Sequence, residues 1–296
     1  MIMKKVLLLL LLLATAVFAQ TQSQPQTQTQ PNEPPPDTDI YIAKLTGGPV
    51  HNITHRKGYD NQPYFLPDNN TILYTSIRGD QSDIYRYDSV TGASIPFTNT
   101  PESEYSPTLT PDGKYISVVR VEVGETQRLW EFPIESGRPK VILENIKPVG
   151  YHAWIDADRV ALFILGEPNT LQIANLKTGT AEVIAKDIGR CIQRVPNSKS
   201  ISFTQKGDDK QWHIQSYDPD TKKMTEIATA VTGNEDADYA WTSKGVLVMA
   251  SGSKLMQWKD SAWQPLADFT EQGIQNITRI AIDPKDEQVA MVALDK

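Results

Sequence analysis

The chain alternates short apolar runs with turn sequences, and residues 106–119 are the clearest example. Alternating apolar positions lead into Pro111-Asp112-Gly113, and a second alternating run follows directly. Proline presets φ, aspartate can accept a hydrogen bond from the backbone two residues on, and glycine tolerates a positive φ. This stretch therefore predicts two antiparallel strands joined by a tight turn.

The same hairpin recurs along the chain. Pro67-Asp68, Pro196-Asn197 and Pro284-Lys285 each precede another apolar run, at intervals of roughly forty-odd residues, the period of propeller blades. Two further copies, at 154–158 and 241–245, keep the strand and the turn but lack the proline. The hairpin column therefore has six members.

A second landmark alternates with the hairpins. Asp39-Ile40-Tyr41 and Asp83-Ile84-Tyr85 open apolar strands that end in Thr-Gly turns, and four looser copies begin at Leu129, Leu171, Ile214 and Leu255. With an outer strand such as 94–97, each repeat has four strands, which we name A to D in chain order. Four strands per repeat predict an all-β, six-bladed β-propeller.

The order of the landmarks predicts how the ring closes. The repeats begin on a C strand at Ile40 and end on A and B strands between Ile280 and Val292. If the N-terminal C and D strands join the C-terminal A and B strands in one blade, no strand edge is left open at the junction. We therefore expect a ring closed by the two ends of the repeat region.

These motifs resemble the propeller repeats of the TolB family over residues 39–296. Pro107, Pro111-Asp112-Gly113 and Asp83-Ile84-Tyr85 match best. The resemblance implies a periplasmic, protein-binding propeller, and similar repeats form the non-catalytic propeller of prolyl-oligopeptidase-type peptidases. The sequence contains no G-x-S-x-G nucleophile motif, so peptidase activity is not expected.

The N-terminal region is unlike the repeats. Lys4 and Lys5 precede an unbroken apolar run, and residues 17–19 end in a small-residue site, a pattern typical of a signal peptide spanning 1–19 and cleaved after Ala19. Residues 20–38 are rich in Pro, Gln and Thr and predict a disordered tether. The expected product is periplasmic or secreted, with no membrane insertion after cleavage.

Charge and cysteine content narrow the function classes. The formal net charge is −7 and becomes −9 without the two lysines of the signal segment, which disfavours nucleic-acid binding. Cys191 is the only cysteine, so no internal disulfide can form, and we interpret it as a small buried apolar residue. We expect a monomer.

The sequence offers little for metal or cofactor chemistry. His51 and His55 lie in a predicted strand, where a spacing of four does not bring side chains together as it does on a helix. The acidic run 235–238 could contribute to a calcium site but is more typical of a solvated loop. We predict no catalytic residues, no metal ligands and no cofactor.

The candidate binding surface is the mouth of the central channel. Large apolar side chains dominate the column that contains Trp154 and Trp241, so these two residues are expected to pack between blades. The column one residue before Pro107 is chemically mixed, which favours recognition over packing alone. Its members are Gln62, Ser106, Tyr151, Cys191, Asp238 and Arg279, and all except Cys191 are our candidate partner-binding residues.

Three functions remain open at this point. The first is an exported, non-catalytic module that binds a protein or peptide in the bacterial cell envelope. The second is an enzyme with a channel-mouth site, for instance a lactonase, a lyase or a glycan-processing enzyme. The third is a sensor of a small ligand or glycan.

Overall fold

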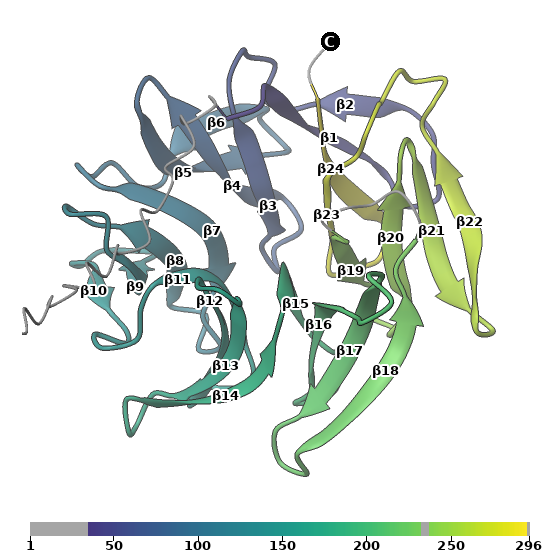
Figure 1. The fold of residues 1–296 in the computed structure, drawn as a ribbon. Coiled ribbons are helices and arrows are strands. Elements are labelled where there is room, and N and C mark those ends of the chain that lie inside the picture. The colour runs from purple at the N-terminus through teal and green to yellow at the C-terminus, as the bar shows by residue number, and fades with distance from the viewer. Residues whose placement is uncertain (1–34, 232–236, 295–296) are drawn as a thin grey trace, which may run out of the picture. The chain divides into compact units, whose positions relative to one another are not determined.

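The computed structural model describes residues 35–231 and 237–294, which form strands joined by turns and loops (Figure 1). The segments assigned to the signal peptide and to most of the tether lie outside the described residues. The strands of the first half are β1 Thr38–Lys44, β2 Val50–Asn52, β3 Asp60–Phe65, β4 Thr71–Arg78, β5 Gln81–Asp88, β6 Ala93–Pro96, β7 Ser103–Leu109, β8 Tyr115–Val121, β9 Gln127–Pro133, β10 Lys140–Val141, β11 Val149–Trp154 and β12 Arg159–Ile164. Those of the second half are β13 Thr170–Asn175, β14 Thr180–Lys186, β15 Ile188–Arg194, β16 Ile201–Lys206, β17 Trp212–Asp218, β18 Lys223–Thr229, β19 Tyr239–Trp241, β20 Leu247–Ser251, β21 Lys254–Lys259, β22 Ala262–Asp268, β23 Arg279–Ile282 and β24 Gln288–Leu294.

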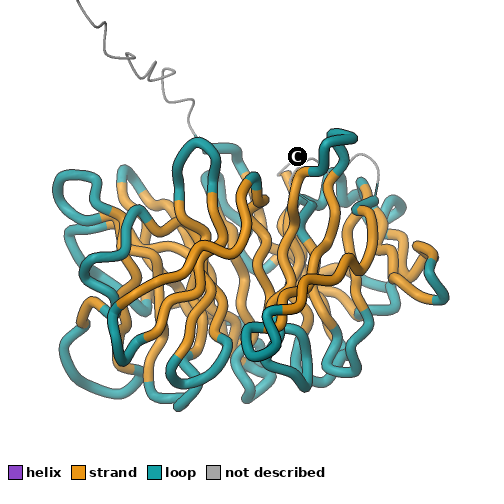
Figure 2. Tube along the Cα trace, turned by 60° about the horizontal axis from the view of Figure 1, so that its bottom comes forward, coloured by secondary structure: helices purple, strands orange, loops and turns teal. Residues whose placement is uncertain are grey.

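These strands form six antiparallel four-stranded sheets arranged around a common centre (Figure 1). Blades 1 to 5 are β3–β6, β7–β10, β11–β14, β15–β18 and β19–β22. The A strand is the inner edge of every sheet, and the loops gather at the two ends of the strands (Figure 2). The predicted six-bladed propeller is confirmed.

The closing blade contains both ends of the repeat region, as the order of the motifs predicted. Its strand order is β2-β1-β24-β23, and β1 pairs with β24 over seven residue pairs, from Thr38 with Leu294 to Lys44 with Gln288. The blade begins slightly earlier than expected, because Thr38 is in β1 and the Asp37 carboxylate accepts a hydrogen bond from the Gly58 amide at 2.6 Å. The last two residues assigned to the tether therefore belong to the folded part.

The turn motif works as its residue types suggest. In the hairpin between β7 and β8, the Asp112 carboxylate accepts hydrogen bonds from the Lys114 amide at 3.1 Å and the Thr110 hydroxyl at 2.7 Å. Gly113 has a φ of 70°, which a residue without Cβ adopts freely. Asp68 binds the Asn70 amide in the same way at 3.0 Å.

The Asp-Ile-Tyr motif joins strand C to the residues that follow strand D. In the closing blade, the Thr54 hydroxyl donates to the Asp39 carboxylate at 2.6 Å and accepts from the Ile40 amide at 3.0 Å. In blade 1, Thr98 makes the same two bonds to Asp83 and to the amide of the next residue, at 3.1 and 2.8 Å. The motif isoleucines, Ile40 and Ile84, have no exposed surface.

The two tryptophans of the hairpin column join neighbouring blades. The indole N–H of Trp154 donates to the Ser117 hydroxyl of blade 2 at 2.9 Å, and that of Trp241 donates to Ser202 of blade 4 at 2.8 Å. Trp154 is buried, and Trp241 packs against a cluster of buried residues between blades 4 and 5. The expected packing role is confirmed. The outer strands differ in length, because β14, β18 and β22 each have seven residues whereas β10 has two.

Candidate functional site

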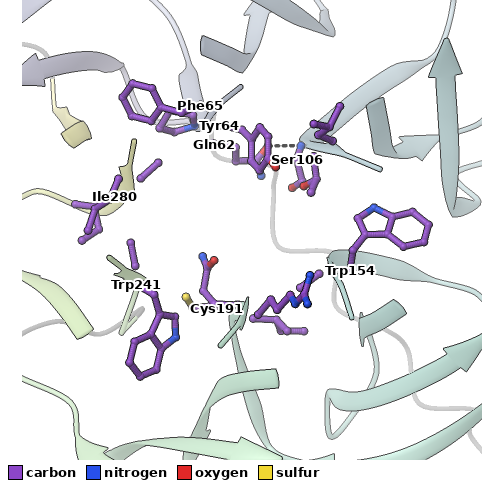
Figure 3. Close-up of a pocket in the computed structure, with 18 of the residues that line it drawn as sticks. Gln62, Tyr64, Phe65, Ser106, Trp154, Cys191, Trp241 and Ile280 are labelled. Carbon is purple, nitrogen blue, oxygen red and sulfur yellow. Dashed lines mark hydrogen bonds between the residues drawn. The ribbon is translucent and has the colours of Figure 1, made fainter. Parts of the chain in front are cut away.

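A cavity of about 600 Å³ lies at the centre of the ring, lined by the A strands of all six blades (Figure 3). All six positions of the sequence-predicted column line it: Gln62, Ser106, Tyr151, Cys191, Asp238 and Arg279. The lining continues along the A strands to the turns after them, as far as Pro111 and Pro284. The column therefore lies along the channel wall, and three of its members, Gln62, Cys191 and Asp238, are buried.

Gln62 and Ser106 hold blades 1 and 2 together. Both have a positive φ, 56° and 55°, at positions where the pairing of strand A with strand B shifts register. Such a bulge re-aims a side chain. The Gln62 amide oxygen accepts hydrogen bonds from the Thr75 hydroxyl at 2.7 Å and from the Ser106 amide at 2.8 Å, the contact drawn in Figure 3. These two candidate residues therefore have a structural role.

Two other members of the column also contact the next blade. The Cys191 thiol lies 3.4 Å from the Tyr239 carbonyl oxygen, to which it can donate. Asp238 accepts a hydrogen bond from the Ile280 amide of the closing blade at 3.1 Å. Cys191 is 3% exposed, which confirms that it is a buried apolar residue, and burial raises the pKa of its thiol well above the usual value.

Arg279 and Tyr151 meet across the channel, although their blades are three positions apart around the ring. The Arg279 guanidinium carbon lies 5.3 Å from the centre of the Tyr151 ring, a cation–π contact. A terminal nitrogen of Arg279 also lies 3.6 Å from an Asp238 carboxylate oxygen, an ion pair that is longer than a hydrogen bond. The structure thus brings three candidate residues together.

More tyrosine and arginine side chains lie near this contact. Burial raises the pKa of Tyr59 to about 12, and the charges of Arg279 and Arg190 oppose that rise, whereas Tyr151 and Tyr105 add to it. Arg190 also lines the cavity. Tyr59 therefore interacts electrostatically with two arginines and two other tyrosines, and three of these residues, Arg279, Arg190 and Tyr151, line the cavity.

A buried pair in the cavity wall was not predicted from the sequence. The His152 Nε2 atom lies 2.7 Å from the Ser117 hydroxyl, which also donates to the Thr108 carbonyl at 3.0 Å. Burial lowers the pKa of His152 to about 3, so its imidazole is neutral at physiological pH. Ser117 is fully buried, and the two residues are 35 positions apart, a spacing that carries no sequence signal.

The remaining candidate positions lie elsewhere. His51 is exposed in β2, and His55 follows that strand with a positive φ. Within residues 35–231 and 237–294, no group of three or more His, Cys, Asp or Glu side chains is arranged to hold a metal ion. No helix in the same ranges is long and apolar enough to cross a membrane. Residues 235 and 236 of the acidic run lie outside the described residues.

Comparisons with known proteins agree with the fold. Residues 32–147 match the TolB beta propeller domain. The structure is similar to that of a putative TolB from Agrobacterium tumefaciens, with a TM-score of 0.69, 14% identity, and 88% of this chain and 99% of that chain covered. An oligogalacturonate lyase in complex with manganese has a TM-score of 0.57 at 14% identity, over 83% of this chain and 80% of that one.

The curated proteins include a relative with a different activity. Dipeptidyl-peptidase 5 of Porphyromonas gingivalis is 27% identical over 206 residues, which are 63% of this chain and 29% of that protein. The chain therefore spans less than a third of this relative's length. The expected resemblance to TolB-like propellers is confirmed, and the similar proteins include TolB, a peptidase and a lyase.

Proposed function

We propose that this chain is an exported, non-catalytic propeller that binds a protein or peptide in the bacterial cell envelope through its central cavity. The N-terminal pattern of residues 1–19 supports export to the periplasm or the medium. The repeats resemble those of the TolB family, and the protein-binding role which that resemblance implies supports the class of partner.

The observation that carries the proposal is the chemical state of the cavity wall. His152 and Cys191 are the usual kinds of residue for acid–base and nucleophilic catalysis, and burial holds both in their uncharged forms at neutral pH. Gln62 and Asp238 contribute their oxygens to hydrogen bonds between blades. Neither the two uncharged groups nor these occupied oxygens offer a ready acid, base or nucleophile, which favours binding over turnover.

The cavity also has the side chains that dominate binding energy at interfaces. Tyrosine and arginine are enriched among the residues whose truncation weakens complexes most. Here Tyr151 and Arg279 face each other across the channel at 5.3 Å, and both line the cavity. A partner that inserts a narrow segment would meet both side chains at once.

Site-specific photo-crosslinking tests this proposal. A photoreactive phenylalanine analogue replaces Tyr151 in the full chain, and in a second protein it replaces Met224, which is 39% exposed on the outer strand β18. Both proteins are expressed in the source bacterium and irradiated in intact cells. We expect a defined envelope protein or peptide to be crosslinked from position 151 and not from position 224.

Two results would contradict the proposal. Equal adducts from both positions would mean nonspecific contact, and adducts from position 224 alone would place the binding surface on the outer strands. A chain that remains in the cytoplasm without cleavage at residue 19 would separately contradict export.

A further inference from the structure

Arg279 has more hydrogen-bonding capacity than its surroundings use. A guanidinium group has five N–H donors in a planar fork. Within the described part of the chain, none of these donors meets an acceptor in hydrogen-bonding geometry, and Nε is buried without a partner. The side chain is only 21% exposed, so bulk water replaces few of the missing bonds. A largely buried cation in this state is suited to receiving an anion from outside the chain.

We infer that Arg279 is the receptor for a carboxylate group of the peptide segment that enters the cavity. This inference rests on the proposed function and assigns the chemical class of its ligand. A carboxylate can accept two parallel N–H bonds from a guanidinium, which a lysine at the same place could not offer. The group can be a C-terminal carboxylate or an Asp or Glu side chain, since both present the same two oxygens.

Asp238 prepares the site without filling it. Its second oxygen lies 3.6 Å from the nearest Arg279 nitrogen, too far for a hydrogen bond, while its first oxygen accepts from the Ile280 amide. The carboxylate therefore stabilises the charge of Arg279 and leaves the donors available. Asp238 and an incoming carboxylate repel each other, so removal of the Asp238 charge should strengthen binding.

The surroundings favour a peptide over other carboxylates. Each A strand is the inner edge of its sheet, so backbone N–H and C=O groups that pair with no other strand line the channel. An extended peptide can pair with such groups through its own amides. The Tyr151 ring beside the guanidinium adds an aromatic surface, and Arg190, which also lines the cavity, adds a second cation.

Titration of the chain from Gln20 onward with defined probes tests the inference. The probes are acetyl-tetra-alanine with a free C-terminal carboxylate, its C-terminal amide, and acetyl-Ala-Glu-Ala-Ala amide. The readout is the guanidinium N–H NMR signal that disappears in Arg279→Lys. We expect saturable shifts with one or both of the peptides that contain a carboxylate, and none with acetyl-tetra-alanine amide, which has no carboxylate. A response to acetyl-tetra-alanine indicates recognition of a chain end, and a response to acetyl-Ala-Glu-Ala-Ala amide indicates recognition of an acidic side chain.

Two variants separate the predicted contact from a general effect on the fold. Arg279→Gln should weaken binding of the carboxylate peptide by at least about tenfold, and Asp238→Asn should tighten it by about threefold or more, both measured by calorimetry. The Asn side chain retains an oxygen for the Ile280 amide, so Asp238→Asn keeps the hydrogen bond between blades. Opposite effects of two changes in one ion pair cannot come from loss of folding.

Several outcomes would overturn the inference. They are equal shifts by the amide and carboxylate forms, unchanged affinity in Arg279→Gln, or no saturable shift with either carboxylate peptide. Digalacturonate as a further probe, if it bound where both peptides did not, would assign the site to an anionic sugar. If the photo-crosslink from position 151 persisted in Arg279→Gln at full yield, the proposed binding function would stand and the carboxylate contact would be wrong.

Discussion

Removal of the Thr54 hydroxyl tests most directly why the Asp-Ile-Tyr motif recurs. The hydroxyl donates to the Asp39 carboxylate at 2.6 Å and accepts from the Ile40 amide at 3.0 Å, and Asp39 is only 1% exposed. Thr54→Val keeps the branched shape and removes both bonds. Strand β1 then loses both hydrogen bonds that the Thr54 side chain makes to the Asp-Ile-Tyr motif.

The expected loss follows from the two bonds. A neutral hydrogen bond contributes about 0.5–1.5 kcal/mol and one to a charged group about 1.5–3 kcal/mol, so the free energy of unfolding should fall by roughly 2–4 kcal/mol. At about 2–4 °C per kcal/mol for a domain of this size, the melting temperature should fall by roughly 4–16 °C. The Asn52 side chain still donates to Asp39 at 2.6 Å, which limits the loss.

Urea denaturation followed by tryptophan fluorescence measures the change in the free energy of unfolding. An unchanged m-value would show that the substitution changes stability and not the surface exposed on unfolding. Thr98→Val is the matched change in blade 1, where the hydroxyl makes the same two bonds at 3.1 and 2.8 Å. Thr225→Val on the exposed face of β18 is the control, with an expected change within about 0.5 kcal/mol. If Thr54→Val and Thr98→Val were as mild as the control, the explanation of the motif by this hydrogen-bond pair would be wrong.

Three further predictions follow from the fold. A chain that starts at Gln20 and one that starts at Pro35 should melt within a few degrees of each other in a thermal scan, because the residues between them have no apolar side chains to bury. Trp154→Phe should cost about 1–3 kcal/mol in urea denaturation because it leaves the Ser117 hydroxyl short of a donor. Hydrogen bonds, chiefly to Asp209, raise the pKa of His213, so its stabilising effect is present below the unfolded-state pKa and is lost as pH rises through the folded-state value. The urea midpoints of wild type and His213→Asn should therefore differ more at pH 5.5 than at pH 8.5.

Most of the architecture could be predicted because each repeat contains its own local signals. A turn such as Pro111-Asp112-Gly113 is determined by residues next to one another in the chain, and the Asp112 bond to the Lys114 amide needs no tertiary contact. The closure by β1 and β24 could also be predicted, since it depends only on the order of strand types along the chain. Counting the repeats was enough to predict the ring.

The start of the closing blade was less predictable. Asp37 and Thr38 have the polar composition of the segment before them, and their place in the fold depends on hydrogen bonds to Gly58 and to the Asp60 carbonyl, both more than 20 residues away. Composition indicates whether a segment can fold by itself. It does not predict hydrogen bonds to residues that are distant in the sequence.

In the cavity, the repeats predicted which residues line the wall but not which partner each residue binds. Alignment of the hairpins placed six residues on one column, and all six line one cavity. Their individual roles depend on the blade next door: Gln62 binds the Ser106 amide and Asp238 binds the Ile280 amide, whereas Arg279 points across the channel to Tyr151. The position of a residue in the aligned repeats predicts how far along the channel it lies. Its hydrogen-bond or ring partner depends on which blades the closed ring places next to it or opposite it. Because most of these polar atoms are used between blades while the Arg279 donors are not, Arg279 is where a ligand can add hydrogen bonds without breaking those that hold the ring together.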